Sequence, residues 1–193
     1  FLLIINYLRF EYSYDDAHVK KDRIFRVPMS TAEKDGKEQT FAFTYPALAP
    51  AMKKDFPEVE EAARFRRQGG IVAYGEQRIV ENGSLYYADA SLFKIFTFRF
   101  AKGNAETAFK ELNDAVITNE TAKKYFGDAD PIGKSLRYNS EDYIVQAVLE
   151  DIPANSHIRF NILLNYEKYI QLTEGNANTS WGWSDFYTYV LLK

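Results

Sequence analysis

A repeated change in hydrophobic period constrains what this chain can fold into. Phe25, Val27 and Met29 alternate with other residues, which is the pattern of a strand with one buried face. Residues 46–56 carry apolar side chains at helical spacing, and a following proline ends that helix because the residue before proline avoids the helical conformation. Residues 59–65 return to a strand pattern. The first third of the chain therefore predicts a strand–helix–strand unit.

Turn residues divide the rest of the chain into short elements. Asp35-Gly36 predicts a hairpin turn ahead of the first helix, and Gly75 and Asn82-Gly83 predict turns between short strands. Strands are expected at residues 71–74, 78–81, 85–88, 115–118, 135–138, 143–151, 158–164 and 186–192. Helices are expected at residues 91–96, 104–111, 120–126 and 166–172.

Two local features refine this pattern. Asn119 is expected to cap the helix at 120–126, which should stop at Gly127. Residues 174–180 are polar and rich in Gly and Asn, and we expect them to form a mobile loop. The outer parts of the chain each contain strand–helix–strand patterns, whereas the middle contains mostly short strands. These patterns predict an α+β fold in which a β-rich insertion interrupts an outer lobe.

Charge and cysteine content exclude several classes of function. The net charge is −3, and basic residues are scattered among acidic ones, so a nucleic-acid partner has little electrostatic support. The chain has no cysteine, which excludes a disulfide-stapled fold, a cysteine zinc site and a thiol nucleophile.

Residues 1–8 are almost wholly apolar and allow two interpretations. The stretch is shorter than the roughly 20 apolar residues that cross a bilayer. It is either the outer end of a transmembrane helix or an ordinary buried helix or strand. The chain begins with Phe rather than Met, so we expect it to be a piece of a longer protein.

Motifs that could carry chemistry are weak. Residues 127–135 resemble a phosphate-binding loop, but Asp128 stands where the first glycine should be, and Pro131 removes a backbone donor. His18 and His157 lie far apart in sequence and show no metal-ligand spacing. We therefore assign no catalytic residue, no cofactor-binding residue and no metal ligand, and we expect that the chain is not an enzyme.

Trp181 and Trp183 are candidate contacts for a partner or a cargo. An exposed tryptophan can grip a sugar, a lipid or a protein surface. The alternative is that both rings cover the core beneath the preceding loop, and the sequence favours this second interpretation.

An ordered set of phrases resembles the MacB/FtsX-like ABC-transporter permeases, particularly those of Bacteroidetes. It begins with FEYSYD (residues 10–15) and DRIFRV (22–27) and continues with VITNETAKKYFG (116–127) and DPIGK (130–134). It closes with YIVQAV (143–148), DIP (151–153) and NSHI (155–158). Each phrase alone is weak, but their order and spacing together are fairly specific.

The resemblance implies a two-lobed periplasmic core domain. The expected parts are the end of the first transmembrane helix (1–9), a porter-like lobe (10–67 and 156–193) and an inserted sabre-like lobe (68–155). Because residue 193 falls short of the family's second membrane helix, the porter-like lobe is expected to be truncated. No residue roles can be carried over, since the family has no shared catalytic motif here.

The same resemblance implies a function in which this chain itself catalyses no reaction. The domain would stand in the periplasm, anchored in the bacterial inner membrane by flanking helices, and would relay ATP-driven motion to export or extract a peptide, lipoprotein or drug-like cargo. Its expected partners are a cytoplasmic ATP-binding subunit, a second permease copy and a periplasmic adaptor or outer-membrane protein. The alternative is a membrane-tethered periplasmic module that binds a ligand or acts as a sensor.

Overall fold

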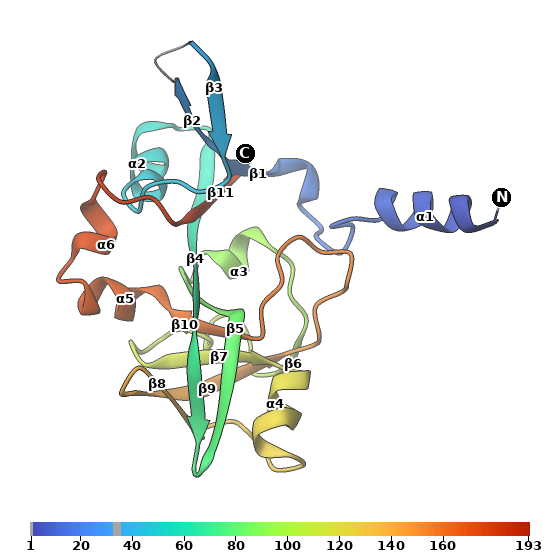
Figure 1. Cartoon of the computed structure of the whole chain (residues 1–193), viewed down its shortest axis with the longest axis vertical. Helices are drawn as coiled ribbons and strands as arrows, with labels where there is room; N and C mark the ends of the chain where they lie inside the picture. Colours follow the sequence, from blue (N-terminus) through green and yellow to red (C-terminus); the bar gives the residue numbers. More distant parts are fainter. Residues whose placement is uncertain (1, 33–35) are drawn as a thin grey trace.

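The computed structural model describes residues 2–32 and 36–193 (Figure 1). Asp35 of the predicted turn, together with Phe1, lies outside the described residues. The strands are β1 (Ile24–Val27), β2 (Met29–Ala32), β3 (Glu38–Phe41), β4 (Val59–Tyr74), β5 (Gln77–Ala88), β6 (Phe100–Lys102), β7 (Asp114–Thr118), β8 (Ser135–Tyr138), β9 (Glu141–Leu149), β10 (Ile162–Asn165) and β11 (Tyr187–Leu192). The helices are α1 (Leu2–Tyr12), α2 (Leu48–Asp55), α3 (Leu92–Ile95), α4 (Asn119–Phe126), α5 (Tyr166–Leu172) and α6 (Asn176–Thr179).

One large mixed sheet organises the molecule. Its strands follow the order β1-β11-β4-β5-β10-β7-β9-β6, and β8 pairs with both β4 and β9. The β10–β5 and β7–β9 pairs are parallel, whereas β4 pairs antiparallel with β5 and with β11. The hairpin β2–β3 forms a separate small sheet that projects from the body (Figure 1). The predicted α+β class is confirmed.

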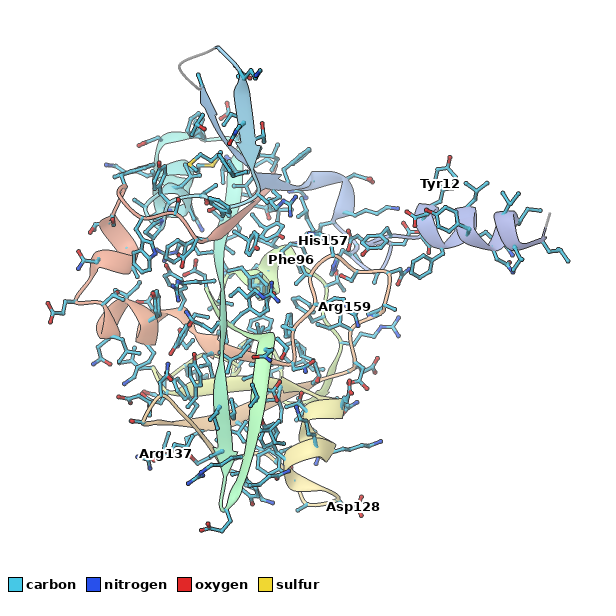
Figure 2. All side chains as sticks on the ribbon, viewed as in Figure 1. Tyr12, Phe96, Asp128, Arg137, His157 and Arg159 are labelled. Atoms are coloured by element: carbon cyan, nitrogen blue, oxygen red, sulfur yellow. The ribbon has the colours of Figure 1, made fainter. Side chains whose placement is uncertain are left out.

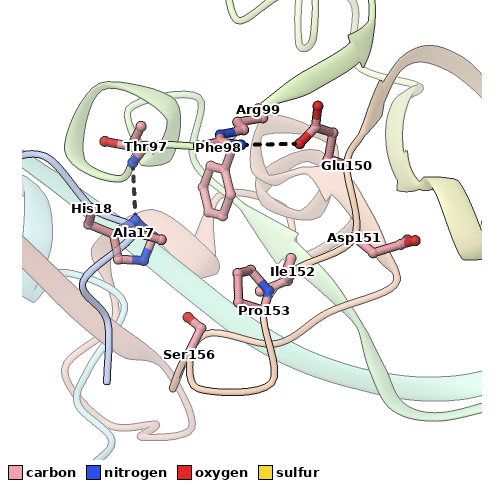
Figure 3. A pocket seen from close by; sticks show the side chains of 10 residues that line it. All are labelled: Ala17, His18, Thr97, Phe98, Arg99, Glu150, Asp151, Ile152, Pro153 and Ser156. Atoms are coloured by element: carbon pink, nitrogen blue, oxygen red, sulfur yellow. Dashed lines mark hydrogen bonds and ion pairs between the residues drawn. The ribbon is translucent and has the colours of Figure 1, made fainter. Parts of the chain in front are cut away.

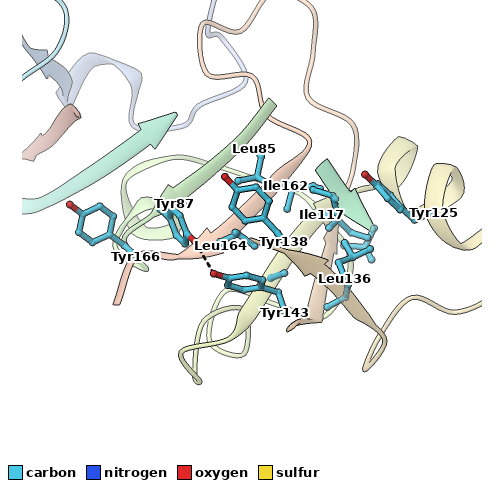
Figure 4. Close-up of a cluster of buried hydrophobic side chains, with 14 of the residues drawn as sticks. Leu85, Tyr87, Ile117, Tyr125, Leu136, Tyr138, Tyr143, Ile162, Leu164 and Tyr166 are labelled. Atoms are coloured by element: carbon cyan, nitrogen blue, oxygen red, sulfur yellow. Dashed lines mark hydrogen bonds between the residues drawn. The ribbon is translucent and has the colours of Figure 1, made fainter. Parts of the chain in front are cut away.

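The central strands are buried on both faces. On β5, Leu85 and Tyr87 belong to one hydrophobic cluster, which Figure 4 shows. Tyr86 and Ala88 belong to a second cluster on the opposite face. The short strands β7 and β10 divide their side chains in the same way, and every one of their residues is buried. This double burial explains why these strands are continuous apolar runs rather than alternating ones.

Helices cover the two faces unequally. Side chains of α4, α5 and α6 pack on the face that contains Leu85 and Tyr87. The other face is covered by α3 and by irregular segments that contribute Phe96, Ile158 and Phe160. The helix α2 packs at the end of β4, next to β11. The helix at 166–172 and the strands at 115–118 and 135–138 are confirmed.

The turn predicted at Asn82-Gly83 is wrong. β5 is continuous across these residues, and its register with β4 shifts between Gln68 and Gly69 as in a β-bulge. Gly83 has φ +72°, a conformation that glycine adopts without steric cost. The turn at Gly75 is confirmed, since Tyr74 pairs with Gln77 across it.

Three other local predictions are corrected. Residues 104–111 form turns rather than a helix, and of the strand predicted at 158–164 only the part from Ile162 is a strand. The cap of α4 is Thr118, whose hydroxyl accepts a hydrogen bond from the backbone N–H of Thr121, and not Asn119. The helix ends at Gly127 as predicted.

The polar segment 174–180, predicted to be a mobile loop, contains α6. Ala177 of this helix is fully buried, and its carbonyl accepts hydrogen bonds from Tyr166 and Arg64. Arg64 is itself buried on β4 and forms an ion pair with Asp89 at 2.9 Å. The segment is ordered because a buried guanidinium needs the acceptors that it supplies.

The helix α1 projects away from the body (Figure 1), and none of its residues is buried. Its apolar side chains are largely exposed, as Figure 2 shows around Tyr12. In the described part of the chain, every helix is too short or too polar to cross a bilayer. The boundary predicted at 67–68 lies inside β4, which extends from Val59 to Tyr74, and the division into two lobes stays a prediction.

Candidate functional site at the N-terminal junction

The segment that follows α1 runs into the body and joins the edge of the sheet. We call residues 13–23 the junction. The backbone N–H of Asp15 donates to the carbonyl of Asn155 at 2.9 Å, and the Asn155 amide donates to the carbonyl of Ser13 at 2.8 Å. Directly after the junction, β1 pairs with β11 along its whole length. The exposed helix is therefore tied to the sheet over a short stretch of chain.

Asp15 is the central polar residue of the junction. One carboxylate oxygen accepts hydrogen bonds from the backbone N–H of His157 at 3.0 Å and from the Ser156 hydroxyl at 3.1 Å. The other oxygen lies 2.5 Å from His157 Nδ1. Burial raises the pKa of Asp15, but these hydrogen bonds outweigh burial and hold the pKa below its usual value. The junction is thereby fastened to the segment before β10.

His18 is the buried residue of the junction, with 5% of its surface exposed. Its ring packs edge-on against Phe96 and Phe98, with centroids 5.0 and 6.0 Å away. The backbone N–H of Thr97 donates to His18 Nδ1 at 3.2 Å. Burial lowers the pKa of His18, so the ring is neutral at pH 7.

Further contacts hold the end of the junction. Lys20 Nζ donates to the carbonyl of Lys94 in α3, and Arg23 Nε donates to the carbonyl of Leu192 at the end of β11. Arg23 also forms an ion pair with Glu60 on β4. The junction therefore contacts three elements of the body, which are α3, β4 and β11.

The structure brings together two histidines that the sequence keeps apart. The rings of His18 and His157 both lie near Phe96, with centroids 5.0 and 6.4 Å from it, and Figure 2 shows His157 beside Phe96. Sequence analysis missed this cluster because no local pattern links residues separated by more than 130 positions. The resemblance did place FEYSYD and NSHI among its phrases, and these phrases meet at Asp15 and His157.

The junction favours a structural role over a catalytic one. Asp15 orients His157, but the Ser156 hydroxyl donates to Asp15 and to a backbone carbonyl rather than to the imidazole. This arrangement lacks the nucleophile–base hydrogen bond that acyl transfer requires. Within residues 2–32 and 36–193, no three His, Asp or Glu side chains are grouped as a metal site would need.

The phosphate-loop-like segment 127–135 forms turns between α4 and β8. Asp130 forms an ion pair with Lys102 at 3.0 Å, and the backbone N–H of Gly133 donates to the carbonyl of Val145. These contacts occupy groups that an anion would need, so the segment is not built to bind phosphate.

The two predicted tryptophans lie in different environments. Trp181 is 55% exposed and lies 5.9 Å from the ring of Tyr45. Trp183 packs against Phe186, 4.9 Å between centroids, and under the guanidinium of Arg66. Covering the core is therefore the role of Trp183, whereas Trp181 presents its ring to solvent.

Comparison with known proteins places this geometry in a family. The family model described as MacB-like periplasmic core domain matches residues 1–193. A search of curated proteins gave no match.

Solved structures show the same fold. A domain of a Porphyromonas gingivalis protein assigned as a permease has a TM-score of 0.77 at 23% identity, covering 91% of this chain and 75% of that one. The periplasmic region of MacB from Actinobacillus actinomycetemcomitans has a TM-score of 0.61 at 15% identity, covering 88% and 73%. The extracellular domain of the noncanonic ABC-type transporter YknZ from Gram-positive bacteria has a TM-score of 0.56 at 14% identity, covering 88% and 82%.

Proposed function

Because the chain belongs to the family of MacB-like periplasmic core domains, we propose that it relays ATP-driven motion from an inner-membrane permease to the periplasm. In this proposal, α1 continues a membrane helix, and the body lies outside the membrane. The relay would serve the export or extraction of a peptide, lipoprotein or drug-like cargo. In this function the domain needs a firm mechanical connection and no reacting group.

The observation that carries the proposal is the junction. An apolar, exposed helix leads within a few residues into Asp15, which is fixed to His157 and Ser156, and then into β1 at the edge of the sheet. A relay requires two arrangements whose equilibrium can be biased from the membrane side. In this proposal, the membrane helix would bias the equilibrium through the short, hydrogen-bonded connection between α1 and the sheet.

The proposed partners follow from this role. A cytoplasmic ATP-binding subunit would supply the energy, and a second permease copy would complete the transporter in the inner membrane. A periplasmic adaptor or outer-membrane protein would receive the cargo. The lobes would divide as predicted, with residues 10–67 and 156–193 in one and 68–155 in the other. β4 crosses their boundary as a continuous strand, which would transmit motion between them.

Inserting three glycines after Ala17 tests the relay. The insertion should uncouple α1 from the body, because flexible residues absorb displacement instead of transmitting it. In the full-length permease, purified with its ATP-binding subunit, we expect the complex to form, whereas transport in cells should fall at least about tenfold, equivalent to ~1.4 kcal/mol.

A matched control places the same three glycines in the β4–β5 turn after Gly75. This turn has positive φ and open space around it, so the insertion should leave both the fold and transport unchanged. Full transport with the insertion after Ala17 would contradict the relay. Loss of transport with both insertions would show instead that the fold tolerates neither.

We further propose that Trp181 contacts the cargo or a periplasmic partner. Trp181→Ala should reduce transport in a strain lacking the native permease, with little change in the free energy of unfolding, because its ring is mostly exposed. Trp183→Ala is the control and should lower the free energy of unfolding by about 3 kcal/mol, because its ring packs on the core. Unchanged transport with Trp181→Ala would remove Trp181 from the contact surface.

A further inference from the structure

A basic groove of about 660 Å³ lies at the free end of the β4–β5 hairpin. Three of the described residues that line it are cationic, namely Arg78, Lys134 and Arg137, and one, Asp142, is acidic. Figure 2 shows Arg137 beside this end of the hairpin, which lies at the opposite end of the molecule from the β2–β3 hairpin (Figure 1). The chain as a whole has a net charge of −3, so the groove locally reverses the overall sign.

Strand pairing places the two arginines of the groove in one row. Ala73 of β4 pairs with Arg78 on one side and with Arg137 on the other. Arg137 pairs in turn with Asp142 of β9. Directly paired residues lie on the same face of a sheet, so these four side chains share one face. Because alanine is short and arginine is long, the row has a shallow floor between two cationic walls.

The positive charge of the arginines is only partly neutralised. Arg137 Nη1 lies 3.6 Å from Asp142 Oδ2, and both side chains are mostly exposed, so this ion pair is weak. Arg78 is exposed and forms no ion pair within residues 2–32 and 36–193. Its guanidinium is therefore available to a ligand.

Lys134 adds a third cation that is held in place by aromatic rings. Its ammonium lies 5.4 Å from the ring centroid of Phe126 and 6.0 Å from that of Tyr74. Lys134 belongs to the phosphate-loop-like segment, but its ammonium takes no part in the contacts that occupy Asp130 and Gly133. The side chain therefore contributes charge to the groove although the backbone of that segment is already paired.

The spacing of the two arginines favours an extended ligand with more than one carboxylate. Neighbouring strands are about 4.8 Å apart, so the two arginine side chains leave the backbone roughly 10 Å apart. Alternate side chains of an extended peptide point to the same side and are about 7 Å apart, which two long side chains can both reach. Each guanidinium can bind one carboxylate through two parallel hydrogen bonds.

We propose that this groove binds an acidic peptide segment of a partner protein, with one carboxylate on Arg78 and a second on Arg137. The backbone of the segment lies over Ala73. Asp142 competes with the ligand for Arg137 and therefore weakens binding. This site does not depend on the proposed transport function.

The test uses two peptides of the same length, acetyl-EGEGEG-amide and acetyl-QGQGQG-amide. Only the first carries carboxylates, and the second replaces each of them with a neutral amide of similar shape. The backbone amide resonance of Ala73 in the 193-residue chain is followed by NMR during titration at an ionic strength of about 0.01 M. We expect saturable shifts with the acidic peptide in the millimolar range or below, and at least about tenfold weaker binding of the neutral peptide.

Three surface variants assign the binding to the groove. Arg78→Gln and Arg137→Gln each remove one cation and should weaken binding of the acidic peptide about 3- to 10-fold. Asp142→Asn removes the competing carboxylate and should strengthen binding about 2- to 5-fold. All three side chains are exposed, so we expect the variants to fold.

Arg99→Gln is the matched control for the arginine variants. Arg99 is also exposed and lies 3.8 Å from a carboxylate, that of Glu150 (Figure 3). The pocket that it lines includes Asp151 as well, so two carboxylates stand against one guanidinium there. That pocket shares no residue with the groove. The variant changes the net charge as Arg78→Gln does and should leave peptide binding unchanged.

The proposal is overturned if the acidic peptide does not bind, or if the two peptides bind equally. Equal weakening by Arg78→Gln and Arg99→Gln would also overturn it, because binding would then follow the net charge and not the groove. Inorganic pyrophosphate and vesicles containing phosphatidylglycerol are titrated as competing anions. If either binds through Arg78 and Arg137 at least as tightly as the acidic peptide, the peptide assignment is wrong and the groove is a site for phosphate groups.

Discussion

At the scale of the residue, Arg64 has a structural role that no sequence pattern indicates. It is buried on β4, forms hydrogen bonds with both carboxylate oxygens of Asp89, and donates to the carbonyl of Ala177. Its guanidinium also lies 4.1 Å above the ring of Tyr166. Burial lowers the pKa of Arg64, but the carboxylate of Asp89 outweighs burial and raises it.

Arg64→Met should be strongly destabilising. The substitution leaves the Asp89 carboxylate without its cation and the acceptors of α6 without their donor. We expect the free energy of unfolding, measured by urea denaturation, to fall by about 3–5 kcal/mol, the range found when one partner of a buried ion pair is removed.

Arg99→Ala is the control for this prediction. Arg99 also pairs with a carboxylate, that of Glu150, but both side chains are mostly exposed and 3.8 Å apart. Its loss should change the free energy of unfolding by no more than about 0.5 kcal/mol. Similar losses for the two variants would contradict the structural role given to Arg64.

At the scale of the element, β6 depends on a close approach to β9. Gly103 directly follows β6 at φ +72°, and a Cβ there would lie 2.7 Å from the carbonyl oxygen of Gln146 and 3.0 Å from the Cβ of Ala147. Ala147 is fully buried, so its backbone cannot give way. Glycine is required here by both conformation and space.

Gly103→Ala should therefore lower the free energy of unfolding more than Gly133→Ala does. Gly133 has nearly the same φ, +77°, but a methyl group added at this position would meet no other part of the chain within 4 Å. Both variants carry the strain of positive φ, and only Gly103→Ala adds a collision, which we expect to cost a further 1–3 kcal/mol, roughly. Thermal unfolding of the two variants measures the difference, and equal melting temperatures would disprove the close approach.

At the scale of the whole molecule, we expect the stability of the body to be independent of α1. The helix buries none of its residues, whereas the junction after it buries His18 and anchors Asp15. The stability of the body should therefore depend on the junction and not on the helix. An exposed apolar helix of this kind fits the proposed continuation into the membrane.

Two truncations test this separation. Deleting residues 1–12 should change the free energy of unfolding by no more than about 0.5 kcal/mol, because surface contacts alone are lost. Deleting residues 1–20 removes Asp15 and His18 as well. We expect this deletion to lower the free energy of unfolding by more than about 2 kcal/mol, because it leaves buried partners unpaired and a void beside Phe96. Urea denaturation measures both, and equal losses would contradict the separation.

Much of the secondary structure could be predicted from the sequence because it depends on near neighbours. The helix at 166–172 and the strand at 115–118 follow from local apolar patterns, and Gly127 ends a helix through its own backbone freedom. The order of phrases also indicated the family. Outside the junction, the sequence supplied Trp181 and Trp183 as candidate contacts but could not say which ring is exposed.

Tertiary structure decided the features that rest on distant partners. Gly83 lies in a bulge directly after the paired residue Asn82, and not in a turn, because β4 pairs with β5 on both sides of it. Residues 174–180 contain a helix because Arg64, more than 100 positions earlier, binds its carbonyl. Asp15 meets His157 only because the fold brings the junction against the segment before β10. Sequence patterns report the preferences of near neighbours, whereas these contacts depend on the order in which strands pair.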